Sequence, residues 1–445
     1  MRWVTHHKPL AVLAVIAFLG LVAVTALRVV KQYQVPGPFD SSHQGMCDFH
    51  NGIYFPARAL IAGVSPYGQG YADSYPVARQ IPFFSPGILL LHTPLAMLPL
   101  HVAEVIYFVF SVALVIVIAM VSAAAAGKGG RVEWVASIAA LLVASRGGHI
   151  TLFDGYFTFE LVLATLLAIH WADEKPGRAA LALAIVSAKP TYIIPLGFLL
   201  LARGNLKALI LGAATSVAIA LAPFMYLAYH EGVRETGQVD LGAGVAKLLN
   251  DIATTQQVHM AMPDESPVHS WTRLDLLASV CKWTRSEPSQ WTHLFVMFAL
   301  LFWPMVAFVM RRRQQIDDGL GGATGAMILL AVLTSLYHQS YDAMLLVVPI
   351  TAAIATPPGY WAATGMHLRW GIAALMLLPQ FNLLSTRSLL TKLDLGPAAY
   401  AFATGLNGLA IAFALLLVCY RERSFATSLR GKRFGEPKSP FAPRK

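Results

Sequence analysis

Charged residues are scarce in this sequence, and their scarcity excludes a soluble globular protein. Only 13% of the 445 residues are Asp, Glu, Lys or Arg, whereas soluble domains carry about a quarter. Hydrophobic residues make up 56% of the chain, and the mean hydropathy is +0.59. Because the apolar runs are continuous and do not alternate with polar residues, the sequence predicts membrane-spanning helices and not a barrel.

Cysteines and the common cofactor motifs are also missing. The three cysteines lie far apart, which excludes a disulfide framework and a cysteine-based metal cluster. We find no P-loop, no GxGxxG before a helix, no HExxH and no GxSxG. Asp-x-Asp, with which soluble sugar transferases hold a metal and a nucleotide, is absent too. The sequence therefore indicates neither a metal nor a cofactor.

The net charge of +10 indicates topology and not nucleic-acid binding. Short basic loops and tails remain cytoplasmic. The basic segments are Arg2/Lys8, Lys175/Arg178, Arg203/Lys207, Arg311–Arg313 and the tail. This pattern places both termini in the cytoplasm and four segments on the outer face of the membrane: residues 31–84, 230–290, 338–342 and 387–397.

Thirteen apolar runs lie between residues 9 and 420. Two cytoplasmic termini require an even number of crossings, so at least one run is re-entrant or merged with its neighbour, and runs 85–99 and 132–145 are the weakest. We expect one transmembrane domain over 1–420, in which the first outer loop, 31–84, carries interfacial helices and the second covers 230–290. The Pro-containing basic tail, 421–445, is predicted to be disordered.

Asp48 is the first candidate for chemistry, because it directly follows the first spanning helix. An acid at a membrane face can move a proton on a substrate that arrives from the lipid. Aromatic residues and an arginine follow it, namely Phe49, Tyr54, Arg58 and Tyr67, and such groups are suited to a sugar or a phosphate. The competing interpretation is a helix N-cap, for which Asp is favoured.

Three further segments carry polar groups between apolar runs. Lys189 interrupts such a stretch, and a lysine there is either functional or reaches for the interface. His338, Tyr341 and Asp342 form either a short polar turn or a clamp for a phosphate or a sugar. His149 follows Gly147-Gly148, whose backbone N–H groups could approach an anion.

Together these residues resemble glycosyltransferase family 87, the polyprenol-phosphate-dependent mannosyltransferases of the GT-C superfamily. The resemblance is spread over roughly residues 45–350 and does not depend on one motif. The matching segments are Asp48-Phe49, Tyr54, Ala57-Arg58-Ala59, Gly63, Pro66-Tyr67, Phe84-Ser85-Pro86, Thr93-Pro94-Leu95-Ala96, Gly148-His149-Ile150, Ala188-Lys189-Pro190-Thr191 and the His338…Tyr341-Asp342 turn.

The resemblance implies an all-α GT-C bundle of about twelve transmembrane helices in the inner (plasma) membrane, with the active site on the periplasmic face. It implies a polyprenyl-phosphate sugar donor, no metal, and Asp48 as the general base. One carboxylate suffices for an inverting transfer, since the second carboxylate of retaining hydrolases is not needed. The residues that we expect to bind the donor phosphate or sugar are Lys189, His338, Arg58, Tyr54, Tyr67, Tyr341, Asp342 and His149.

We therefore expect a membrane mannosyltransferase that acts on a lipid-linked or envelope glycan acceptor. An arabinofuranosyltransferase of the same family, using a polyprenyl-phosphate pentose, is an alternative that the sequence does not separate from it. A lipid or polysaccharide transporter is a second alternative, because interrupted helices with an embedded lysine suit it too. Transporters of this kind tend to have two related halves, and we find no internal symmetry in this sequence.

Overall fold

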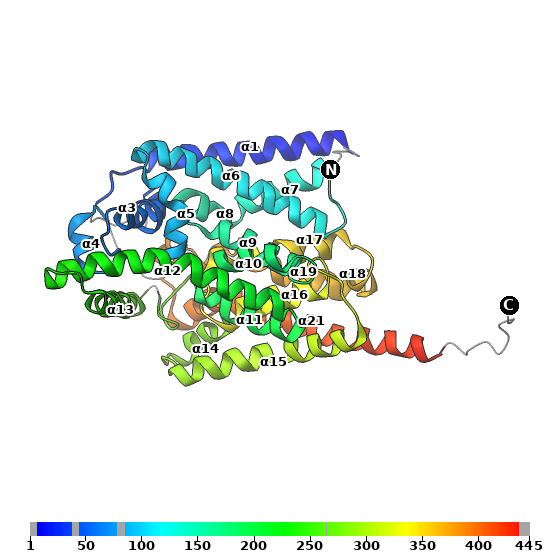
Figure 1. The fold of residues 1–445 in the computed structure, drawn as a ribbon. Helices are drawn as coiled ribbons and strands as arrows, with labels where there is room; N and C mark the ends of the chain where they lie inside the picture. The colour runs from blue at the N-terminus through cyan, green and yellow to red at the C-terminus, as the bar shows by residue number, and fades with distance from the viewer. Residues whose placement is uncertain (1–6, 38–43, 78–84, 264, 436–445) are drawn as a thin grey trace.

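The computed structural model describes residues 7–37, 44–77, 85–263 and 265–435, which form a bundle of helices without a regular strand among them (Figure 1). The elements of the first half are α1 (Lys8–Lys31), α2 (Cys47–Phe49), the π-helix η2 (His50–Tyr54), α3 (Phe55–Ile61), α4 (Gln69–Ser74), α5 (Pro86–Ala96), α6 (Leu100–Ala125), α7 (Val132–Ala144), α8 (Arg146–Asp154), α9 (Thr158–Trp171), α10 (Pro176–Val186), α11 (Pro190–Arg203) and α12 (Leu206–Thr236).

The second half contains two 3-10 helices, η3 and η4, among its α-helices. Its elements are α13 (Leu241–Met260), α14 (Leu276–Thr284), α15 (Gln290–Gln314), α16 (Ala323–Ser335), η3 (Ser340–Leu346), α17 (Val347–Ala355), α18 (Tyr360–Ala363), α19 (Met366–Phe381), η4 (Leu383–Ser385), α20 (Arg387–Leu393) and α21 (Pro397–Gly435).

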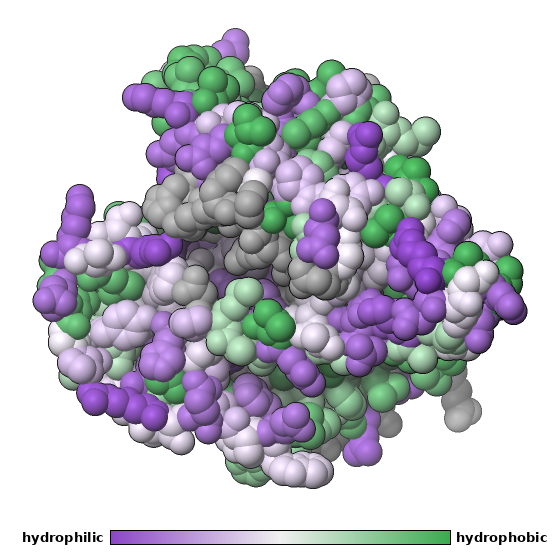
Figure 2. Space-filling view, turned by 90° about the vertical axis from the view of Figure 1, so that its left-hand side faces the viewer, coloured by the Kyte–Doolittle hydropathy of each residue, from purple (hydrophilic) through white to green (hydrophobic). Residues whose placement is uncertain are grey.

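The two ends of the bundle differ in what they carry. Helices α3, α4 and α13 lie at one end, which we call the loop end (Figure 1). Helix α1 begins and α21 finishes toward the opposite end, which we call the terminal end (Figure 1). Figure 2 looks onto the loop end, where hydrophilic side chains are widespread.

Within the described ranges, five helices are long and apolar enough to cross a membrane: α1, α6, α12, α15 and the part of α21 up to Arg423. They confirm the expectation of a helical membrane protein. Helices α7 and α8 together would form a sixth span, bent by 73°. The bend lies at Ser145, whose side chain caps α8 by accepting a hydrogen bond of 3.0 Å from the backbone N–H of Gly148. A capping serine both ends one helix and begins the next, so the weak run 132–145 is half of a bent pair.

The two long loops that the sequence placed on the outer face are largely helical. The first contains α2, η2, α3 and α4, and the second contains α13 and α14. Helix α21 runs through Gly435 and so includes the first part of the basic tail. Residues 436–445, with Pro437, Pro440 and Pro443, and also Phe84 lie outside the described residues.

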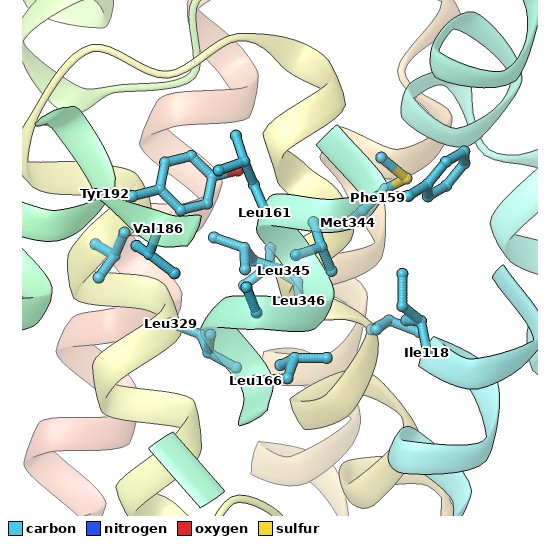
Figure 3. Packing of buried hydrophobic residues seen from close by; sticks show 14 of the residues in the cluster. Ile118, Phe159, Leu161, Leu166, Val186, Tyr192, Leu329, Met344, Leu345 and Leu346 are labelled. Atoms are coloured by element: carbon cyan, nitrogen blue, oxygen red, sulfur yellow. The ribbon is translucent and has the colours of Figure 1, made fainter. Parts of the chain in front are cut away.

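The core of the bundle surrounds η3. All thirteen residues of α16 are buried, as expected for a helix that is apolar on every side. Figure 3 shows Leu345 and Leu346 of η3 among Leu161 and Leu166 of α9 and Leu329 of α16. Each of these five side chains has no exposed surface. This apolar layer supports the polar turn that precedes it.

Candidate active site

Asp48 lies in the first turn of α2 and is half-buried. The N-cap of this helix is Met46, in the left-handed conformation with φ of 62°. The backbone N–H of Met46 donates to the carbonyl of Phe153 at 2.9 Å, which ties α2 to the end of α8. Asp48 is therefore inside the helix and is not its cap, so the competing interpretation of this acid as an N-cap does not hold.

A cluster around Glu104 fixes the segment that follows Asp48. The Glu104 carboxylate lies 2.5 Å from His50 Nε2 and 2.9 Å from His101 Nδ1. It also accepts a hydrogen bond of 2.9 Å from the hydroxyl of Tyr33. This cluster was not predicted from the sequence, although an acid in a 26-residue apolar helix is itself a signal of function or structure.

Lys189 and Asp342, 153 positions apart, meet in a buried ion pair. The Lys189 ammonium lies 2.8 Å from both carboxylate oxygens. Oδ1 also accepts from the Tyr192 hydroxyl at 2.7 Å, and Oδ2 accepts from the backbone N–H of Gln339 at 2.8 Å. The Asp342 carboxylate, which has no exposed surface, is thus surrounded by one cation and by hydrogen-bond donors, which stabilise its charged form.

His338 completes this group, which we call the Asp342 cluster (Lys189, Tyr192, His338, Gln339 and Asp342). Its Nδ1 lies 3.1 Å from Oδ2 of Asp342, so this nitrogen carries a proton and donates a hydrogen bond to the carboxylate. The other ring nitrogen, Nε2, is buried and has no hydrogen-bond partner within the described part of the chain. A buried imidazole oriented by a carboxylate with one nitrogen unused is available for a substrate.

The second long loop braces the turn that carries His338. Arg273 and Gln339 form an isolated β-bridge, and the backbone N–H of Leu274 donates to the carbonyl of His338 at 2.8 Å. Arg273 is itself paired with Asp275 at 2.9 Å, and both are buried. Loop and turn are thus one folded unit, which fixes the backbone on either side of the imidazole.

Helix α8 joins the Asp48 segment to the Asp342 cluster. A Cβ added at Gly147, near its start, would lie 2.9 Å from the Cα of Tyr341. A Cβ added at Gly155, which caps its end, would lie 2.7 Å from the Cβ of Phe49. A side chain at Gly147 would therefore meet the Tyr341 backbone, and one at Gly155, where φ is 76°, would meet the base of the Phe49 side chain, so each position favours glycine. Eight residues of helix span about 12 Å, so Phe49 and Tyr341 lie at the two ends of one short rod.

The ring of Tyr341 faces the ion pair, as the resemblance suggested for a residue of the site. Lys189 Nζ lies 5.1 Å from the centroid of this ring and 5.0 Å from that of Tyr192. Tyr156 lies against the other side, with ring centroids 5.5 Å apart. Tyr192 was not anticipated, although its position three residues after Lys189 is the spacing at which helical neighbours meet.

His149 contacts α1 and not the Asp342 cluster. Its Nε2 lies 2.6 Å from the guanidinium of Arg28, and its Nδ1 lies 3.2 Å from the hydroxyl of Thr25. Arg28 also lies over the ring of Phe153, 4.3 Å from its centroid. These contacts fasten α8 to the first spanning helix.

Tyr54, Arg58 and Tyr67 lie apart from the Asp342 cluster, in the first loop. The Tyr54 hydroxyl donates to the carbonyl of Leu98 at 2.8 Å and accepts from exposed Arg58 at 3.1 Å. Tyr67 is buried, and its carbonyl accepts a hydrogen bond from Thr255 of α13. Arg58 is the cation of this group that a ligand outside the protein could reach.

No three His, Cys, Asp or Glu side chains of the described ranges are grouped as the ligands of a metal ion would be. Three features of the region are suited to chemistry: the half-buried carboxylate of Asp48, the oriented imidazole of His338 and the buried Lys189–Asp342 ion pair. Such a set can accept a proton at one place and donate hydrogen bonds to an anion at another.

The comparison with protein families identifies the family of this chain. The model of glycosyltransferase family 87 matches residues 83–335, more than half of the chain. The matched part contains α8 and Lys189, while Asp48 precedes it and His338 follows it. No curated protein and no solved structure matched the chain.

Proposed function

The chain belongs to glycosyltransferase family 87, and from this premise we propose that it transfers mannose from a polyprenyl-phosphate donor to a lipid-linked or envelope glycan. The observation that carries the proposal is the pair of polar groups at the two ends of α8: half-buried Asp48 and the Asp342 cluster. The reaction is an inverting displacement at the anomeric carbon.

In the proposed reaction Asp48 takes the proton of the acceptor hydroxyl. The acceptor oxygen then forms a bond to the anomeric carbon of the donor on the side opposite to the phosphate. The bond from that carbon to the bridging phosphate oxygen breaks, and the lipid phosphate leaves with the electron pair. In this step His338 carries a proton on each ring nitrogen, so Nε2 donates a hydrogen bond to the phosphate while Nδ1 donates one to Asp342. The Lys189 charge adds to the stabilisation of the phosphate.

The separation along α8 suits this geometry. A base, the acceptor oxygen, the anomeric carbon, the bridging oxygen and a phosphate-binding donor in line span on the order of 10 Å, with hydrogen bonds of about 2.8 Å and reacting atoms about 3 Å apart. The rod of about 12 Å set by α8 is of the same size. A base and a phosphate-binding group at its ends can act on one sugar at the same time.

The remaining residues have supporting roles in the proposal. Asp342 orients His338 and is itself fixed by Lys189, while Tyr341 lines the sugar pocket beside the ion pair. Exposed Arg58, which donates a hydrogen bond to Tyr54, attracts the anionic donor from outside the protein. Tyr67 shapes the first long loop, in which both residues lie. His149 positions α8 through its contacts with α1.

We also propose that the loop end is periplasmic and the terminal end cytoplasmic, in the inner membrane. The basic residues of the terminal end, among them Arg203 paired with Asp317, support this orientation. Adding the bent pair α7–α8, helix α19 and five of the shorter apolar elements to the five long helices gives twelve crossings, an even number that puts the two termini on the same side of the membrane. The crossing elements are α1, α6, α7–α8, α9, α10, α11, α12, α15, α16, η3–α17, α19 and α21, and the short helix α5 is not counted.

The proposal is tested by transfer from polyprenyl-phosphate-mannose to an extracted glycolipid acceptor, with purified protein in nanodiscs. Asp48→Asn should lower turnover by about 10²- to 10⁴-fold, the usual contribution of a general base. Asp394→Asn is the matched control, since this acid is exposed and distant in sequence, and should leave turnover unchanged. Near-normal turnover by Asp48→Asn would overturn the role of the base.

The same assay separates the alternatives for the reaction. Polyprenyl-phosphate-arabinofuranose is offered beside the mannose donor, and consumption of the pentose alone would replace the assignment of the sugar. Lipid movement across vesicles without a new glycosidic bond would replace the assignment of an enzyme by that of a transporter.

A further inference from the structure

A cavity of about 540 Å³ lies between α1, α7, α17 and α19, and none of the residues of the Asp342 cluster lines it. Its wall along most of its length is aliphatic. The aliphatic residues that line it from α7 and α17 are Ile138, Leu141, Leu142, Val347, Ile350 and Ile354. From Trp134 to Ser145 it follows α7 for about 16 Å, which is close to the thickness of one leaflet's hydrocarbon layer, about 15 Å. We call it the terminal groove.

The end of the terminal groove that lies toward the terminal end is cationic. Lys128 and Arg131, from the turn between α6 and α7, line it together with His7. Neither Lys128 nor Arg131 has a carboxylate within 4.0 Å in the described part of the chain. Lys128 Nζ lies 5.7 Å from the ring centroid of Trp134, which also lines the groove. Cations beside a tryptophan at the end of an apolar groove are the arrangement that receives an anionic lipid headgroup.

Glu133 indicates that a ligand in the terminal groove should carry a hydrogen-bond donor. It is 3% exposed and lines the groove next to the two cations. Its Oε2 is buried without a hydrogen-bond partner among the described residues. A buried carboxylate oxygen without a donor is costly, so a bound headgroup that carries hydroxyl groups would relieve that cost. The formal charges of Lys128, Arg131 and Glu133 sum to +1, which one phosphodiester balances.

We propose that the terminal groove binds an anionic phospholipid with a hydroxyl-bearing headgroup, of the phosphatidylglycerol type, from the leaflet opposite to the Asp342 cluster. Lys128 and Arg131 bind the phosphate, Glu133 accepts from the headgroup hydroxyls, and one acyl chain lies between α7 and α17. The sugar donor is a different ligand. Its phosphate belongs at the other end of the bundle, since α6 alone spans about 39 Å between the two ends.

The groove also reaches the element behind the site. Gln380 lines its far end and donates through Nε2 to the carbonyl of Ala343, one residue after Asp342. An acyl chain in the groove would therefore pack against the support of the Asp342 turn. The lipid is expected to raise the thermal stability of the protein.

Delipidated protein in detergent is titrated with phosphatidylglycerol, phosphatidylmethanol and phosphatidylcholine of identical chains, and bound lipid is counted by native mass spectrometry. Phosphatidylglycerol should bind at least about tenfold more tightly than phosphatidylcholine, since each basic residue contributes about fivefold. Lys128→Ala with Arg131→Ala should abolish that preference. Lys175→Ala with Lys207→Ala removes two exposed basic residues elsewhere and should retain it. Equal binding of the two lipids, or equal behaviour of the two double variants, overturns the site.

The role of Glu133 is tested by phosphatidylmethanol, a phosphodiester whose headgroup has no hydroxyl. The native protein should prefer phosphatidylglycerol to it, and Glu133→Ala should bind both alike. Equal binding by the native protein overturns the hydroxyl contact. Thermal unfolding of each variant without lipid verifies that it is folded.

The position of the acyl chain is tested by fluorescence quenching with brominated phosphatidylglycerol. Trp134 lies in the groove, whereas Trp303 is 57% exposed on α15. The quenching that saturates at low lipid concentration should disappear in Trp134→Phe and persist in Trp303→Phe. Saturable quenching that survives in Trp134→Phe places the lipid elsewhere and overturns the proposal.

Discussion

Asp48 in α2 and Asp342 in η3 are carboxylates that lie near opposite ends of helix α8, and their surroundings differ in almost every respect. Asp342 is fully buried and accepts hydrogen bonds from Lys189, Tyr192, His338 and the backbone of Gln339. Asp48 is half-buried in a three-residue helix that leads into a π-helical turn. One acid is enclosed by donors and the other remains near the surface.

The difference separates two uses of the same side chain. A base must be reached by its substrate and must gain a proton during the reaction. Asp342 meets neither condition, because Lys189 and His338 contact both of its carboxylate oxygens and it has no exposed surface. It can orient an imidazole instead, whereas Asp48 has the accessibility of a base. The proposal assigns the two roles accordingly.

The largest expected effect is a difference in stability between variants of Asp48 and variants of Asp342. Asp48→Asn and Asp342→Asn should both lose at least about 10²-fold in turnover, yet only the second should unfold easily. Asp342→Asn leaves the Lys189 charge buried without a counter-charge, which costs about 3–5 kcal/mol. Thermal unfolding of the two purified variants measures this contrast. Equal loss of stability would show that Asp48 is a structural acid as well.

The next effect measures how much the Lys189–Asp342 ion pair contributes to stability. Lys189→Met alone should lose about 3–5 kcal/mol of stability, because it strands the Asp342 carboxylate in the core. Lys189→Met combined with Asp342→Asn removes both charges and should recover at least half of that loss without recovering turnover. Unfolding by denaturant and the transfer assay report the two quantities separately. Additive losses in the double variant would contradict the ion pair.

A smaller effect distinguishes the two nitrogens of His338. His338→Asn can keep the hydrogen bond from the Nδ1 position to Asp342 but has no group at the Nε2 position, so it should lose about 10- to 100-fold in turnover. His338→Gln can place its amide where Nε2 was and should lose less. The transfer assay on both variants decides the matter, and the reverse order would mean that the imidazole has only a structural role.

The smallest effect concerns Lys282, in the loop that braces the turn. Burial lowers the pKa of Lys282 to about 7, since the nearby Asp275 offsets the burial only in part. The unfolded chain binds its proton up to about pH 10.4, so stability should rise with pH between about 7 and 10. Lys282→Met should flatten this dependence and gain about 1–2 kcal/mol at pH 7. Unfolding at three pH values measures it, and an unchanged slope would contradict it.

Much of the architecture could be predicted from the sequence, because long apolar runs identify membrane helices without further information. The runs near residues 9–30, 102–126, 207–229, 291–310 and 398–420 correspond to α1, α6, α12, α15 and α21. The short elements were harder to predict. Between α7 and α8, where Ser145 accepts a hydrogen bond from the backbone of Gly148, the chain bends by 73°. The two glycines at 147 and 148 are typical of a turn, but they do not give the size of the bend.

The candidate site could be predicted residue by residue but not as an arrangement. Lys189 and Asp342 were both expected to contact the donor, and nothing in a separation of 153 positions indicates that they bind each other. His50 and Glu104 were missed for the same reason. Pairings between distant helices depend on how the helices pack, and a single sequence does not record that packing.

Helix α8 has a further consequence for the sizes of substrate that the protein can accept. Gly147 and Gly155, at its two ends, contact Tyr341 and Phe49, so the helix cannot shift along its axis relative to these residues. Adding one residue would lengthen it by 1.5 Å and rotate one end by about 100° relative to the other. Only insertions of whole turns preserve both faces, and each lengthens the helix by about 5.4 Å. The spacing between Asp48 and the Asp342 cluster can therefore change only in steps of whole helical turns.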